Sequence, residues 1–94
     1  MNYADARDLL TSVHHFPGSY IIKAIGRSQE DFVGRVVLAA RTSLERAADV
    51  HYSVRSTPHG RHVAVTLELT VLTPDEVLQV YKALRIINGL KVLL

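Results

Sequence analysis

The stretch that decides the fold is PHGRHVAVTLELTV, residues 58–71. Apolar residues alternate with polar or small ones from Val63 to Val71, and a period of two residues is typical of a strand with one buried face. Residues 50–55 alternate in the same way on the other side of Pro58-His59-Gly60. A short loop containing glycine between two alternating runs predicts an antiparallel hairpin.

Amphipathic helices are expected on both sides of this hairpin. Apolar residues repeat at intervals of three and four over 32–44, and Ser28 followed by Asp31 resembles a capping box at the start of that helix. Thr73-Pro74-Asp75-Glu76 combines an N-cap hydroxyl, a proline at the first helical position and an acid three residues after the cap. The second helix therefore begins there, and Asn88-Gly89 supplies a left-handed residue that ends it. The charged residues expected on the solvent side of the first helix are Arg35, Arg41, Glu45 and Arg46.

Two further strands complete the pattern. Residues 19–26 are rich in β-branched side chains and end at a glycine, and residues 90–94, which are apolar except for Lys91, are expected to form a final strand. The resulting order, βαββαβ, predicts an α+β domain of ferredoxin-like topology, a four-stranded antiparallel sheet with two helices on one face. We expect one domain, residues 1–94, in which 1–15 form a short N-terminal helical extension before Phe16-Pro17-Gly18.

Composition narrows the function classes. The 94 residues are 48% apolar, enough for one core, and carry a formal net charge of +2 with no run of five like charges. Nucleic acid is therefore not the expected partner, and the two central strands lack the aromatic stacking platform of RNA-recognition domains. Cysteine is absent, which excludes disulfides and thiolate chemistry. With no secretory signal and no apolar run of about 18–20 residues, we expect a cytoplasmic protein without a membrane partner.

Scattered short motifs point to a family. These are Phe16-Pro17, the strand 20–26 with Lys23, then Ser56, Gly60, the strand 63–71 and Val80-Tyr81-Lys82-Ala83-Leu84. In order and spacing they resemble the YbeD-like family of small bacterial proteins of unknown function, over most of the chain. His62 departs from the pattern, because an aromatic residue is typical shortly after the hairpin glycine. The resemblance implies a ferredoxin-like fold similar to small-molecule-sensing ACT domains, and it supplies no catalytic residues.

Neither a catalytic centre nor a metal site is expected. The chain has no nucleophile elbow, no phosphate-binding glycine loop and no paired carboxylates without a helix-start role. Five histidines are present, but neither their spacing nor any HExxH pattern brings three or four ligands together. We therefore expect a protein that is not an enzyme and that uses no cofactor.

The expected open face of the sheet is the most informative surface. Pairing the strands about the hairpin loop places His51 opposite Glu68, Ser53 opposite Thr66 and Arg55 opposite Ala64. The residues proposed as a ligand or partner site on this face are Lys23, His51, Arg55, His62 and Glu68. An ordinary solvated sheet face is the competing interpretation, since antiparallel sheets commonly wet one side.

These features support two hypotheses of function. The first is a small regulatory or ligand-binding module that takes a small anionic ligand on the open face and associates as a homodimer, because Ile21, Ile25 and Leu93 would leave apolar area exposed there. The second is a protein-interaction adaptor that offers the edge strand 90–94 or the leading helix to a protein partner. Weak RNA binding ranks third.

Overall fold

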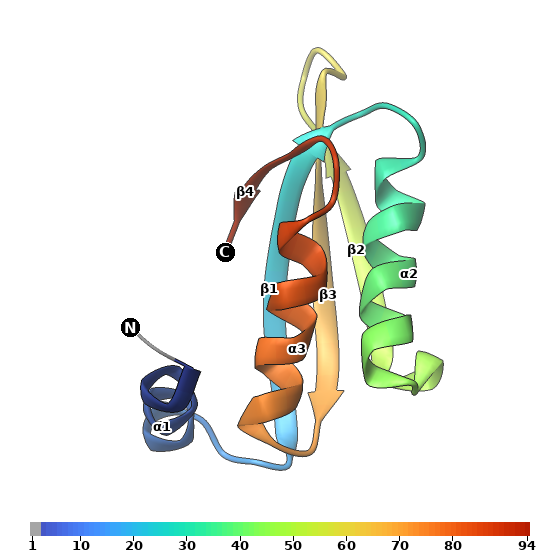
Figure 1. The fold of residues 1–94 in the computed structure, drawn as a ribbon. Coiled ribbons are helices and arrows are strands. Elements are labelled where there is room, and N and C mark those ends of the chain that lie inside the picture. Colours follow the sequence, from blue (N-terminus) through green and yellow to red (C-terminus); the bar gives the residue numbers. More distant parts are fainter. Residues whose placement is uncertain (1–2) are drawn as a thin grey trace.

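A computed structural model describes residues 3–94, and it has the predicted ferredoxin-like βαββαβ architecture (Figure 1). Its elements are α1 (Tyr3–Val13), β1 (Gly18–Arg27), α2 (Phe32–Leu44), the 3₁₀ turn η1 (Ala47–Asp49), β2 (Val50–Ser56), β3 (His62–Val71), α3 (Pro74–Arg85) and β4 (Leu90–Leu93). The strands form one antiparallel sheet in the order β2-β3-β1-β4. The Phe16–Pro17 peptide bond between α1 and β1 is cis.

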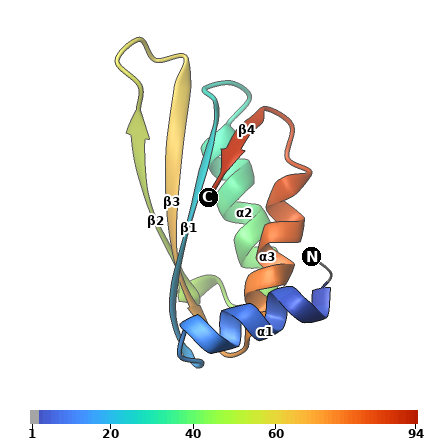
Figure 2. The ribbon, with the colours of Figure 1, turned by 90° about the vertical axis from the view of Figure 1, so that its left-hand side faces the viewer.

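The hairpin register agrees with the prediction. His51 pairs with Glu68, Ser53 with Thr66 and Arg55 with Ala64, with no bulge between them. α2 and α3 cover one face of the sheet and leave the other open, as Figure 2 shows, and α1 lies on the helix side near the start of α3. The sidedness on which the predicted site depends is therefore present.

The hydrophobic core lies between the sheet and the two covering helices. One side of each alternating strand and the inner stripe of each helix supply it, because both periodicities bring apolar side chains onto a single face. The buried apolar residues are Ile22, Ala24, Phe32, Val36, Val37, Ala40, Leu44, Val50, Val63, Val65, Leu67, Leu69, Val71, Val77, Val80 and Leu84.

The start of α2 differs from the sequence prediction. The helix begins at Phe32 with Asp31 as its N-cap, and the Asp31 carboxylate accepts a hydrogen bond from the Gly34 backbone N–H at 3.1 Å. Ser28 instead follows β1, where its backbone N–H donates to the Arg61 carbonyl. Gly34 is needed for the cap itself, because a Cβ at this position would overlap the Asp31 carboxylate.

Three arginines expected in solvent are engaged with the backbone. Arg35 donates to the carbonyls of Glu30 and Asn88, and Arg41 donates to the Val50 carbonyl. Arg46 donates to Thr70 and pairs with acidic side chains. These three guanidinium groups therefore bind backbone carbonyls of neighbouring segments, which a helical wheel cannot show.

The last strand also differs. β4 pairs Leu90 with Gly26 and Val92 with Ile25, so Lys91 is an extra residue in a β-bulge. Leu93 then pairs with Ala24 and packs on the core, whereas Val92 occupies the open-face position expected for Leu93. Asn88-Gly89 lies in the turn before β4, and α3 has already ended at Arg85.

Candidate functional site

The five predicted site residues share the open face of the sheet. Lys23 lies on the central strand β1, His51 and Arg55 on the edge strand β2, and His62 and Glu68 on β3. They do not converge on one point. Lys23 pairs with Thr66 and Arg55 with Ala64, so these two cations are two strands and two residues apart, roughly 12 Å between Cα atoms.

His51 and Glu68 lie directly opposite each other at one end of this face. They line a shallow cleft of about 120 Å³ together with Tyr52, Ser53 and Thr66. Across the part of the chain that the structure describes, no hydrogen bond or ion pair joins the His51 and Glu68 side chains. The pair therefore leaves both polar groups open to a ligand, but the cleft is too small for more than a few atoms.

Charge is divided unequally between the two layers. Five of the eleven Lys and Arg residues lie on strands or on the β2–β3 hairpin, but only one of the nine Asp and Glu residues does. That acid is Glu68, and the other eight lie on helices or in the segments around them. The bases of the sheet layer are Lys23, Arg27, Arg55, Arg61 and Lys91. The sheet layer is therefore net positive and the helical layer net negative.

A basic cleft lies where β1 ends, at the β2–β3 hairpin and beside β4. It has a volume of about 430 Å³, and we call it the basic cleft from here on. Its lining residues are Arg27, Ser28, Gln29, Gly60, Arg61, His62 and Lys91. Only His62 among them belongs to the residues predicted from the sequence. The strand register could have predicted Arg27, because it pairs with His62. Lys91 reaches the cleft through a β-bulge that has no signal in the sequence.

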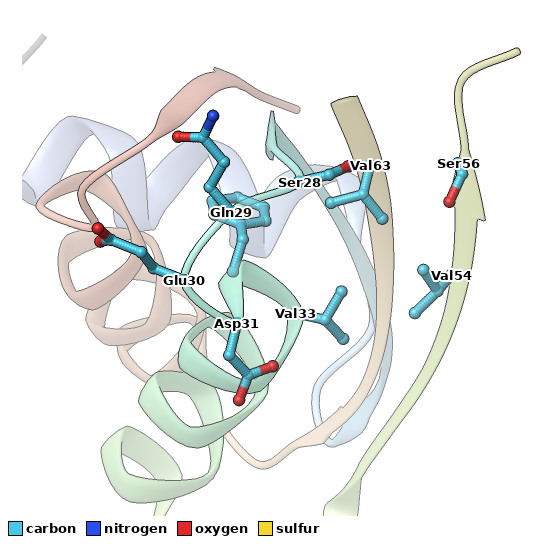
Figure 3. A pocket seen from close by; sticks show the side chains of 9 residues that line it. Ser28, Gln29, Glu30, Asp31, Val33, Val54, Ser56 and Val63 are labelled. Atoms are coloured by element: carbon cyan, nitrogen blue, oxygen red, sulfur yellow. The ribbon is translucent and has the colours of Figure 1, made fainter. Parts of the chain in front are cut away.

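A different cleft lies between the start of α2 and the edge strand β2 (Figure 3). Its volume is about 300 Å³, and Val33, Val54 and Val63 from three different elements surround it. Glu30 and Asp31 line it as well, and both have positive φ angles, 52° and 54°. Apolar walls and two acids on the lining make this cleft electrostatically unlike the basic cleft.

The side chains with displaced pKa values are Arg46, Glu76 and Tyr81, whose contacts join elements of the fold. The Arg46 guanidinium, hydrogen-bonded to it, lowers the pKa of the Glu76 carboxyl, and the same contact raises the pKa of Arg46. Burial and the nearby Tyr20 hydroxyl raise the pKa of Tyr81. Glu76 and Tyr81 belong to α3, and none of these three groups lines the basic cleft.

Residues 3–94 contain no group of three or more His, Cys, Asp or Glu side chains placed to hold a metal ion. No helix within the same residues is long and apolar enough to cross a bilayer.

The fold defines a small α+β domain with one open sheet face. A family model described as "Protein of unknown function (DUF493)" matches residues 11–94, so the chain belongs to this family, the YbeD family, which confirms the resemblance. The comparison with curated proteins gave no match. The comparison with solved structures gave none either.

Proposed function

We propose that the protein is a binding module without catalytic activity that takes up an anionic ligand on the open face of its sheet. The division of charge supports this proposal, because the sheet layer carries five bases against the single acid Glu68. A surface of one sign raises the local concentration of oppositely charged ligands and speeds their association. A regulatory role, which we expect from the sequence resemblance alone, would follow from binding of this kind.

The cations of the sheet are available to a ligand. The side chains of the five sheet-layer bases make no hydrogen bond or ion pair with any residue of the segment 3–94. These bases are Lys23, Arg27, Arg55, Arg61 and Lys91. Arg35, Arg41 and Arg46 on the helical layer donate to backbone carbonyls. A free cation on a rigid strand loses little entropy on pairing, so uncommitted bases favour binding over a structural role.

Catalysis is not part of this proposal. A catalytic site needs a nucleophile or proton-transfer group beside a partner that activates it. Glu76 and Tyr81 have displaced pKa values, but Arg46, burial and Tyr20 account for them within the helical layer. The basic cleft supplies cations, a serine and a histidine, a set that suits binding of charge more than acid–base chemistry.

A second candidate function is a protein-interaction adaptor that docks on the same face. Ile21 is 61% exposed there and Val92 43% exposed, and Leu94, which pairs with Lys23 through backbone hydrogen bonds, is 63% exposed. Apolar side chains among cations are typical of protein-binding surfaces. The two candidates differ in what covers Ile21, a protein surface or water.

Amide chemical-shift perturbation tests the proposed function. Wild-type protein is titrated with inorganic phosphate, citrate and glutamate, and we expect saturable shifts on β1, β3, β4 and the hairpin but not on α2 or α3. The variants Lys23→Glu and Lys82→Glu make the same change of charge, on the sheet and on α3 respectively. We expect the sheet variant to weaken binding more. Absence of saturable shifts, or shifts centred on the helices, would overturn the proposal.

A further inference from the structure

We propose that the basic cleft binds the phosphoryl group of a small phosphomonoester, an inference that rests on the proposed function and narrows it to one end of the sheet. Three bases reach the cleft from separate segments of the chain: Arg27 from the end of β1, Arg61 from the hairpin and Lys91 from β4.

Backbone hydrogen bonds fix the frame of the basic cleft and use none of its cationic side chains. The Ser28 N–H donates to the Arg61 carbonyl at 3.0 Å, which ties the end of β1 to the hairpin. The Arg27 N–H donates to the Gly89 carbonyl at 3.1 Å, which ties the same end to the turn before β4. Arg27 also pairs with His62 across the β1–β3 ladder. The three cations are therefore held on a preformed support, which reduces the cost of binding.

The β-bulge brings the third cation to the basic cleft. Leu90 and Val92 pair with the consecutive residues Gly26 and Ile25, so Lys91 has no partner in the ladder. Bulges re-aim a side chain, and this one removes Lys91 from the regular alternation of β4 and places it on the lining of the cleft.

The lining chemistry fits a phosphoryl dianion. The cleft is lined by two arginines and a lysine but by no carboxylate, and across residues 3–94 these three side chains have no hydrogen-bond or ion-pair partner. A guanidinium presents two parallel N–H donors that match two phosphate oxygens, and an ammonium adds a compact charge. Ser28 and Gln29 add neutral donors. Three cations therefore match a ligand with two negative charges better than a ligand with a single carboxylate.

The size of the cleft favours a phosphorylated small molecule over a free ion. About 430 Å³ lies within the range of small-molecule sites, roughly 300–1,000 Å³, and exceeds what one phosphate group fills. Gly60 borders this space with φ +70°, and a Cβ there would meet no atom within 4 Å, so the hairpin leaves room beside the cations. The remaining volume can hold the organic part of the ligand.

Isothermal titration with inorganic phosphate and glycerol phosphate tests the inference. The cleft variants are Arg27→Gln, Arg61→Gln and Lys91→Gln, and the matched controls on the same sheet face are Lys23→Gln and Arg55→Gln. All five side chains are exposed, so the variants should fold. We expect each cleft variant to raise the Kd for glycerol phosphate roughly tenfold, since a charge-assisted hydrogen bond is lost. The Lys23 and Arg55 variants lower the positive charge of the face but lie outside the cleft, so we expect them to raise the Kd by a clearly smaller factor.

The possible failures can be told apart. If the controls weaken binding as much as the cleft variants, or if inorganic phosphate binds and glycerol phosphate does not, the inference is wrong and the proposed function stands. If wild type binds neither these probes nor any other anion saturably, both are wrong. A single-stranded RNA oligomer forms a further arm, and RNA binding that depends on the cleft residues while glycerol phosphate fails to bind would overturn the small-molecule assignment.

Discussion

Arg46 and Glu76, thirty residues apart in the chain, form a two-pronged ion pair that joins the segment after α2 to the first turn of α3. The Arg46 Nη1 and Nη2 atoms lie 2.7 and 2.8 Å from the Glu76 Oε2 and Oε1 atoms. Arg46 also contacts Asp49 at 2.6 Å, and Glu76 accepts the Leu72 backbone N–H at 2.6 Å. One carboxylate therefore fixes the geometry at the junction of β3, α3 and the segment after α2.

Glu76→Gln tests this junction through the pH dependence of stability. The pKa of Glu76 is lowered in the folded state, so its contribution is present above the unfolded pKa, near 4.5, and is lost as the pH falls through the folded pKa. We expect the variant to lose about 1 kcal/mol at neutral pH, a modest value because the pair is partly exposed, and to lose less stability than wild type on acidification. Urea denaturation between about pH 3 and 7 measures both.

Glu45→Gln is the matched control for Glu76→Gln, because Glu45 is an exposed carboxylate at the end of α2. We expect this variant to follow the wild-type stability curve at every pH. If the two variants gave the same curve, the ion pair would not be the source of the pH dependence.

Gly26→Ala tests how closely β1, α2 and the turn before β4 approach one another. A Cβ at this position would overlap the Phe32 ring and lie 2.7 Å from the Gly89 carbonyl oxygen. Because one of these neighbours is backbone, relaxation is limited, and we expect destabilisation of about 1–3 kcal/mol by chemical denaturation. Gly60→Ala, where a Cβ meets nothing within 4 Å but φ is +70°, should cost about 1 kcal/mol. Because Gly26 is not among the glycines with a positive φ, a Gly26→Ala variant as stable as wild type would show that its neighbours relax and that crowding does not restrict this position.

The sequence predicted what depends on local pattern. Alternation on both sides of Gly60 was sufficient to place His51 opposite Glu68, because register follows from loop length and the buried face. Thr73 was sufficient to begin α3, where its Oγ1 accepts the Glu76 N–H. Ser28 and Asp31 are both good N-cap residues, so propensity could not choose between them. Packing of Phe32 against Gly26 places Asp31 at the cap instead.

The sequence predicted the open-face residues of the candidate site but not the basic cleft, because only the former depend on local pattern. Lys23 and Arg55 share the open face because strand alternation is local, and the register of the ladders bears this out. The basic cleft brings Lys91 beside Arg27 and Arg61, three segments that meet only in the folded sheet. The bulge that places Lys91 there has no sequence signature in residues 90–94, four of which are apolar, so the concavity is visible only in the folded structure.

Tyr20 links α1 to the body of the fold. Its ring lies 4.8 Å from the His14 ring and 6.2 Å from the Tyr81 ring, and the two tyrosine hydroxyls are 3.5 Å apart. We expect Tyr20→Leu to speed hydrogen exchange of the α1 amides, since both ring contacts are lost, while Tyr20→Phe leaves exchange within about twofold of wild type because it keeps the rings. Tyr52→Leu, on the exposed edge strand, serves as the control. Unchanged exchange in Tyr20→Leu would contradict this anchoring role.

Self-association through the open face should become stronger as the salt concentration rises. A two-fold dimer would bury Ile21, which is 61% exposed, but it would also bring the Lys23 and Arg55 side chains of one copy toward the cations of the other. Repulsion between like charges weakens as salt screens them. We therefore expect sedimentation to show a monomer at about 20 mM salt and a growing dimer fraction at about 300 mM.

The apolar part of that contact can be isolated by substitution. Ile21→Ser should abolish the dimer at high salt, because it removes exposed apolar area from the sheet face. Ile86→Ser makes the same change at an 85% exposed side chain just after α3 and should leave the dimer intact. Stronger association at low salt, or equal effects of the two substitutions, would place any dimer contact elsewhere than on the sheet. Bound phosphate should act like salt in this assay, since neutralising the basic cleft lowers the repulsion that keeps two sheets apart.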